Sequence, residues 1–297
     1  MEDHDVLNEM QMLEVRPQRN STGNAFTQGV IDFNWSIGNN RVFIPSKSYV
    51  RIKTTLSSPN VAYCDNFAAG LWQNVYFRVG GQDVSSIVSN YTQGDQLLKR
   101  LEKTQAYVDS VGQSVGYDKT ALKVGEAGTL INGENVVMWQ PAIGAFKINS
   151  GLSAGDYRLS LSPNVNFKTA CIRHNEDLSD DAAATLNDLT ITDLSLFICT
   201  ARANTNPSGT EKFILHEQLV QSKPLVNGSN TLDFVVPTST TGLSFFIQDG
   251  RAGAKAPGTA GTSIVRPIAL TYFKNNTITA GVAGVPASNE DDLKMKS

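Results

Sequence analysis

The residues that could perform chemistry in this chain are few and lie far apart. The three histidines, His4, His174 and His216, have no second histidine or cysteine at the spacing of a zinc site. Cys171 precedes His174 by three residues, which in a strand would place the two side chains on opposite faces. No glycine-rich phosphate loop of either common spacing occurs. The sequence therefore predicts no catalytic, cofactor-binding or metal-binding residue.

Two groups of side chains could still form a binding site. The acidic loop over 175–181 carries carboxylates of the kind that bind calcium, although a solvated turn is the interpretation that we favour. Trp35, Trp72 and Trp139 could stack on sugars, but each lies in a strand-like run, which favours packing in a core or an interface. Paired carboxylates for glycoside hydrolysis are set by spatial separation, and nothing singles out two of the 28 acidic residues.

Composition indicates a weakly charged globular protein. The chain has 297 residues, 40% hydrophobic and 18% charged, and a formal net charge of −3. A negative balance gives no general attraction to nucleic acid or anionic membranes, so we expect no direct nucleic-acid binding. The cysteines Cys64, Cys171 and Cys199 are odd in number and are expected to be free, buried thiols, which favours assembly in a reducing compartment. No apolar run is long enough to span a bilayer, and the acidic start is unlike a signal peptide.

The elements that would position any site are mainly strands. Runs rich in β-branched and aromatic residues, several of them alternating with polar residues, predict half-buried strands. They cover 30–37, 48–56, 71–79, 84–88, 135–139, 157–161, 165–172, 189–200, 213–220, 230–236 and 242–248. Gly80-Gly81 predicts a hairpin turn. Leucine and valine at helical spacing predict one inserted helix near 93–111.

The order of these segments divides the chain into four parts. Residues 1–28 are expected to be a polar, acidic arm that contacts other subunits or an inner partner. Residues 29–203 form a first β-sandwich, and 204–211 form a linker of turn-forming residues. Residues 212–297 begin a second sandwich and end in a polar tail. A sandwich started twice suggests a building block and not a catalyst.

This order resembles the double jelly-roll major capsid proteins of adenoviruses, tectiviruses, virophages and polinton-like viruses. The hairpin at Gly80-Gly81-Gln82, a helix opening near Tyr91 and the run Leu189–Thr200 are similar to the first jelly roll of that family. The later runs Phe213–Val220 and Leu243–Gln248, with an Asn-Gly-Ser turn between them, are similar to the start of the second. The resemblance implies an all-β, jelly-roll protein of the virion that is not an enzyme and needs no cofactor. It also implies three subunits in a pseudo-hexagonal capsomer of an icosahedral shell, with a penton or minor capsid protein as a further partner.

One departure from the family leaves alternatives open. Fewer residues follow Gly209 than a second eight-stranded roll with ordinary loops usually needs. The second roll is therefore compact, or the chain is a fragment, or it is a single elaborated jelly roll with an appendage, as in vertex (penton) proteins. The rival from another functional class is a carbohydrate-binding or adhesive β-sandwich that uses exposed aromatic residues and the acidic loop.

Overall fold

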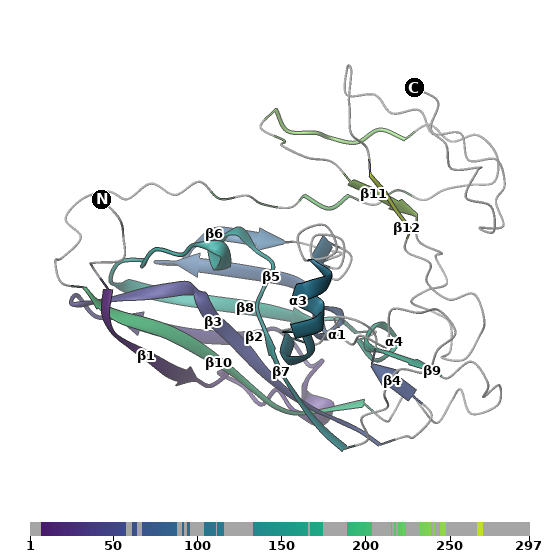
Figure 1. The fold of residues 1–297 in the computed structure, drawn as a ribbon, viewed down its shortest axis with the longest axis horizontal. Coiled ribbons are helices and arrows are strands. Elements are labelled where there is room, and N and C mark those ends of the chain that lie inside the picture. Colours follow the sequence, from purple (N-terminus) through teal and green to yellow (C-terminus); the bar gives the residue numbers. More distant parts are fainter. Residues whose placement is uncertain are drawn as a thin grey trace. The chain divides into compact units, whose positions relative to one another are not determined.

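The structure is a computed structural model. It describes residues 7–57, 61–63, 67–87, 91, 94–95, 104–110, 112–115, 133–165, 167–174 and 189–203, and after these 215, 217, 219–221, 223, 232–238, 240, 244–247 and 266–269. The chain forms two compact units, the first made of 1–220 with 250–262 and the second of 221–249 with 263–297. The first unit contains the β-sandwich, in which two antiparallel four-stranded sheets lie one against the other (Figure 1).

Eight strands of the first unit form the two sheets, four strands in each. Sheet A has the order β1-β10-β3-β7, and sheet B has the order β2-β8-β5-β6. Their bounds are β1 Leu7–Val15, β2 Ile31–Ile37, β3 Arg41–Leu56, β5 Trp72–Val79, β6 Gln82–Ile87, β7 Gly133–Trp139, β8 Gly155–Pro163 and β10 Leu189–Ala203. Successive strands alternate between the sheets except β5 and β6, which are neighbours in sheet B. The eight strands pair as first with last, second with seventh, third with sixth and fourth with fifth. This is the order of an eight-stranded jelly roll, and the all-β jelly-roll prediction is confirmed.

Aromatic side chains join the two sheets. Phe43 of sheet A packs against Trp35, Phe77 and Tyr157 of sheet B, with ring centroids 5.2–6.2 Å apart. Farther along the sandwich, Trp139 of sheet A stacks on Trp72 of sheet B at 5.4 Å. All six side chains are buried, because the inward positions of alternating strands carry the large rings.

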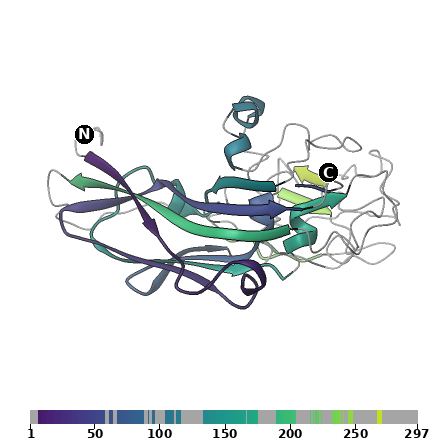
Figure 2. The ribbon, with the colours of Figure 1, turned by 90° about the horizontal axis from the view of Figure 1, so that it is seen from below.

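The longest strands, β3 and β10, run side by side across the sandwich (Figure 2). Their pairing shifts register between Phe197 and Cys199, where β3 bulges at 45–48. Ser48 holds this bulge, since its Oγ donates to the Ile44 carbonyl at 2.8 Å and accepts from the Cys199 N–H at 2.9 Å. Such a bulge lets one long strand bend without leaving its sheet.

The predicted hairpin at Gly80-Gly81 is present between β5 and β6. Val79 pairs with Gln82, so the loop has two residues. Both glycines have positive φ, 57° and 84°, which the mirror-image turns of two-residue hairpins require and which a side chain would disfavour.

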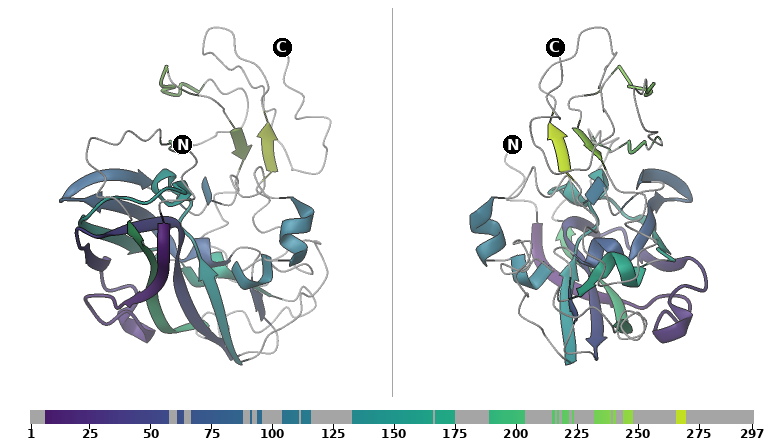
Figure 3. Two further views of the ribbon diagram at one scale, coloured as in Figure 1. Left: turned by 60° about the vertical axis from the view of Figure 1, so that its left-hand side comes forward. Right: turned by 90° about the vertical axis from the view of Figure 1, so that its right-hand side faces the viewer.

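Residues 1–28 are not simply an arm. They contain β1, which pairs along Leu7–Val15 with β10 and forms an edge of sheet A; it is the dark purple strand of Figure 3. The sequence pattern does not predict this strand, because Met10, Met12 and Glu14 are exposed and not in the core. Backbone hydrogen bonds to β10 hold β1 in the sheet.

The prediction of a strand over 165–172 is also wrong. Helix α4 spans Phe167–Cys171, and only the short β9, Ile172–His174, follows it and pairs with β4, Val61–Tyr63. A turn at Asn164 starts the helix, with the Asn164 carbonyl accepting from the Phe167 N–H at 3.1 Å. The helix packs against α1, Phe67–Gly70, so tertiary contacts override the β-forming composition.

The predicted helix near 93–111 is helical at its described residues 91, 94 and 95 but is interrupted at Thr104, and residues 96–103 lie outside the described residues. Helix α3 then spans Gln105–Ser110. Thr104 Oγ1 accepts from the Tyr107 N–H at 3.3 Å, which starts the helix there. The 3₁₀ segments described in the first unit are Gly23–Ala25, Gly112–Val115 and Gly144–Lys147.

In the second unit, the described strands are β11, Ser244–Ile247, and β12, Arg266–Ala269, which pair antiparallel. The run expected as a strand over 230–236 is neither strand nor helix over its described residues 232–236. There the Gln221 side chain donates to the Val235 carbonyl and accepts from its N–H at 2.6 and 3.2 Å. Half of the run 213–220 lies outside the described residues, and a complete second roll stays a prediction.

Candidate functional site

The three tryptophans do not form a sugar-stacking surface. Trp72 and Trp139 have no exposed area, and Trp35 is 8% exposed. Their rings pack between the sheets, so the core-packing interpretation is confirmed. The exposed aromatic platform that a carbohydrate-binding module would need is not made by these residues.

The other candidate groups remain separate. Cys171 and Cys199 are buried thiols, and Cys171 Sγ donates to the Phe67 carbonyl oxygen at 3.2 Å. Cys64 and the acidic loop lie outside the described residues. Within the described part of the chain, no three His, Cys, Asp or Glu side chains gather as a metal site, and no helix is long and apolar enough to cross a membrane.

The outer face of sheet A combines apolar and charged side chains. Outward residues Tyr49, Arg51 and Lys53 alternate with buried ones along β3. The Tyr49 ring stacks on Phe197 of β10 at 5.4 Å, and the Arg51 guanidinium lies 4.9 Å from the centre of the Phe197 ring. Arg51 also reaches two carboxylates, Asp193 at 2.8 Å and Glu14 at 3.2 Å. Such a network fixes long side chains in place across three strands.

Exposed apolar residues are concentrated on the two edge strands of sheet A. Within the eight strands, the exposed large hydrophobic residues are Met10, Met12 and Leu13 on β1, Val136 and Met138 on β7, and Val84 on β6. Met10 is 55% exposed and Met138 44%. An apolar patch rimmed by charges is typical of a surface that contacts another protein. We call these five residues of β1 and β7 the edge patches.

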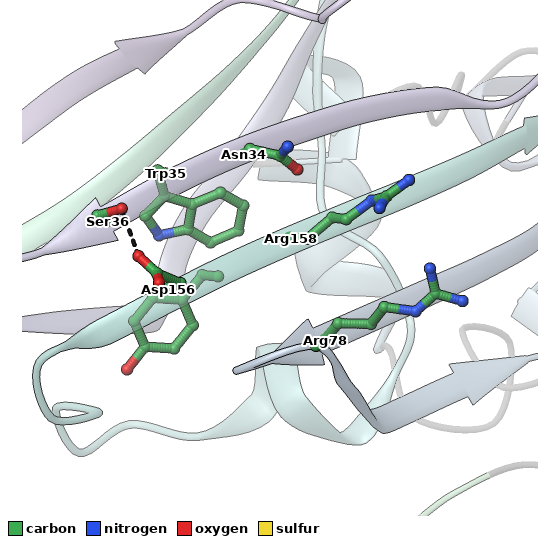
Figure 4. Close-up of a pocket in the computed structure, with 8 residues that line it drawn as sticks. Asn34, Trp35, Ser36, Arg78, Asp156 and Arg158 are labelled. Carbon is green, nitrogen blue, oxygen red and sulfur yellow. Dashed lines mark hydrogen bonds between the residues drawn. The ribbon is translucent and has the colours of Figure 1, made fainter.

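The outer face of sheet B is polar. Its centre holds the pair Asp32–Arg158, in which Arg158 Nε and Nη2 donate to the two carboxylate oxygens at 3.0 and 2.7 Å. Burial raises the pKa of Asp32, but hydrogen bonds from Arg158 and Ser160 outweigh it, so the pKa lies below its ordinary value. Beside this pair is an open hollow of about 390 Å³, lined by Asn34, Trp35, Ser36, Arg78, Gly81, Asp156, Tyr157 and Arg158 (Figure 4).

The carboxyl group of Glu217, which follows the eight strands in the sequence, is hydrogen-bonded to strand β6. Ser85 of β6 is buried, and its Oγ donates to Glu217 Oε1 at 2.5 Å and accepts from the Ala145 N–H at 3.2 Å. Burial raises the pKa of Glu217 above its ordinary value of 4.5, although hydrogen bonds from Ser85 and Gly144 and the charge of Lys147 oppose the shift. Nearby, Val220 packs against the core. The chain after β10 is therefore attached to the sandwich at this point.

Replacing Glu217 with glutamine should remove a pH dependence of stability. A raised carboxyl pKa means that the folded protein binds the proton more tightly, so the stabilising effect is full below 4.5 and is lost as the pH rises through the raised pKa. The variant should gain stability over the wild type more at pH 7 than at pH 5, as measured by urea unfolding at both pH values. An equal difference at the two pH values would contradict the assignment.

The chain is similar to several solved structures. The structure is similar to a chain of the Sputnik virophage particle, with TM-score 0.45, 11% identity, and coverage of 82% of this chain and 56% of that one. For the mavirus major capsid protein the values are 0.39, 12%, 80% and 52%, and for the Faustovirus major capsid protein 0.37, 8%, 67% and 55%. Two of these three neighbours are named as major capsid proteins.

The chain spans about half the length of these solved structures, 52–56% of each. No family model and no curated protein matches the sequence.

Sequence reasoning missed the edge patches. Met10 and Met12 lay in a segment expected to be an arm, and Val136 and Met138 were not distinguished from the buried positions Val137 and Trp139 between them. The alternation along β7 could have separated the two sets, since outward positions of a strand recur every second residue. An apolar residue at an outward position is the signal to look for.

Proposed function

We propose that this chain is a structural subunit of a viral capsid, which assembles with copies of itself and carries out no catalysis. The observation that carries the proposal is the complete eight-stranded jelly roll with apolar residues exposed on both edge strands of one sheet. Jelly-roll sandwiches are a recurrent architecture of capsid shells, and a shell subunit needs lateral contact surfaces in place of a reactive cleft.

The edge patches are the contact surface that supports assembly best. They lie on opposite edges of sheet A, β1 and β7, so one copy offers an apolar patch to a neighbour on either side. The charges between them, including Arg51, Asp193 and Glu14, are already paired within one chain and can form the polar surroundings of such a contact. We propose a homotrimer as the unit of assembly, located in the virion, with a penton or minor capsid protein as a further partner. The vertex (penton) protein is the alternative within the same class.

Substituting serine for Met12 and Met138 together should weaken self-association at least about tenfold, because burial of each side chain contributes about 1.5–3 kcal/mol. Sedimentation velocity across a concentration series measures the effect. Val84 is the matched control: it is similarly exposed, at 41%, but lies on sheet B, and Val84→Ser should associate like the wild type. Unchanged association of the double variant would exclude the edge patches, whereas a wild type that stays monomeric would exclude the function itself.

A further inference from the structure

Two arginines lie directly opposite each other on the outer face of sheet B. Arg78 of β5 pairs in register with Arg158 of β8. Like charges at directly opposed positions destabilise a sheet unless other groups offset them. Here Asp83 accepts from Arg78 Nε at 2.5 Å, and Asp32 holds Arg158 through two contacts. The two carboxylates keep both guanidinium groups in fixed positions on neighbouring strands.

The carboxylates leave part of each guanidinium available. Among the described residues, the hydrogen bonds engage Nε of Arg78, and Nε and Nη2 of Arg158. Both Nη atoms of Arg78 and Nη1 of Arg158 therefore keep donors for a ligand. The two side chains extend in the same direction from their strands (Figure 4), and they are 30% and 42% exposed.

The hollow offers hydrogen-bond donors and not a net positive charge. Its lining carries two arginines and one carboxylate, Asp156, while Asp32 and Asp83 do not line it but offset the charges of the arginines that they pair. Asp156 Oδ1 accepts from Ser36 Oγ at 2.6 Å, and both lie away from the guanidinium ends (Figure 4). Preorganised guanidinium groups with free donors are the groups that proteins use for carboxylates, sulfates and phosphates.

We infer that this hollow binds an oxyanion, a carboxylate, sulfate or phosphate group, between Arg78 and Arg158. The oxygens of the ligand accept from the free Nη donors of both arginines. Asn34, which pairs in register with Arg158, can bond a hydroxyl group that adjoins the anionic group. The oxyanion is therefore either a free inorganic ion or the acidic group of a sugar, and the volume of about 390 Å³ admits one small ligand. This site is independent of the proposed role in assembly.

Titration of the full chain with sodium sulfate, followed through the Nε–Hε signals of arginine by NMR, tests the inference. The signals of Arg78 and Arg158 should shift together and saturate, with a dissociation constant on the order of 1 mM. Arg78→Gln should weaken binding at least about tenfold, because it removes the donors of one guanidinium. The matched control is Arg202→Gln, which removes an equally charged, 58% exposed side chain of sheet A and should leave binding unchanged.

Two further arms distinguish the source of the oxyanion. An acidic monosaccharide that binds more tightly than sulfate, while its neutral counterpart does not bind, identifies a sugar acid as the ligand. Equal binding of sulfate and the acidic sugar identifies a site for the free oxyanion. Shifts that never saturate, or equal affinities of wild type and Arg78→Gln, would overturn the proposal. The thermal unfolding of each variant without ligand is measured alongside, so that a loss of binding is read only from folded protein.

Discussion

Replacing Phe43 with alanine is expected to lower the free energy of unfolding by about 3–5 kcal/mol. The Phe43 ring is fully buried and lies within 5.2–6.5 Å of four aromatic rings, those of Trp35, Phe77, Phe146 and Tyr157. It is the residue of sheet A on which the rings of sheet B converge, so its removal leaves a cavity between the two layers. Urea unfolding monitored by circular dichroism measures the change.

Two other variants make this result specific. Phe43→Leu keeps most of the buried volume and should cost less than half as much as Phe43→Ala, because the smaller cavity removes fewer contacts. Val84→Ala, at an exposed position of β6, should change stability by less than about 0.5 kcal/mol. A Phe43→Ala protein as stable as the Val84→Ala protein would show that the sheets are not joined at Phe43.

Replacing Arg19 with alanine is expected to cost about 2–4 kcal/mol, the second largest effect. Its guanidinium donates to five backbone carbonyls of the loop between β1 and β2: those of Asn20, Ala25, Phe26, Gly29 and Val30. Burial lowers the pKa of Arg19, which Asp32 partly opposes, yet an arginine stays protonated. In the alanine variant these carbonyls lose their hydrogen-bond donor. The backbone of Phe26, whose ring packs beside Trp72, is then no longer held in place.

Lysine at the same position separates geometry from charge. Arg19→Lys keeps the positive charge but cannot reach five carbonyls, so it should recover less than half of the lost stability. Arg202→Ala, which removes an exposed arginine paired with Glu9 at 3.7 Å, should be nearly neutral. Full recovery by lysine would mean that charge alone, and not the planar fork, holds the loop.

The sequence predicted the strands whose inward faces carry large apolar residues. The alternation of Ile31, Phe33, Trp35 and Ile37 with polar residues fits a half-buried strand, and β2 has that burial pattern. The hairpin was predictable because two adjacent glycines meet a specific backbone requirement. By contrast, β1 depends on a ladder to β10, whose partners lie more than 180 residues away in the sequence, as Met12 with Cys199. No local pattern contains such a pairing.

The candidate surfaces were harder to predict than the fold. Arg78 and Arg158 are 80 residues apart, and only the register of β5 with β8 brings them face to face. The edge patches likewise follow from which strands lie at the edges of sheet A, a property of topology and not of composition. Helix α4 shows that a local sequence pattern can also mislead. Phe167 belongs to a β-forming run, but the turn at Asn164 and the contact with α1 make it helical.

The measurement that tests the central claim most directly is the solution mass of the purified chain, from sedimentation velocity at high micromolar concentration, together with negative-stain images of the same sample. A subunit built for a shell should appear as trimers or larger closed assemblies of uniform shape, and dilution should shift them toward monomer. A chain that remains a monomer throughout the concentration range, with no particles in the images, would contradict the account.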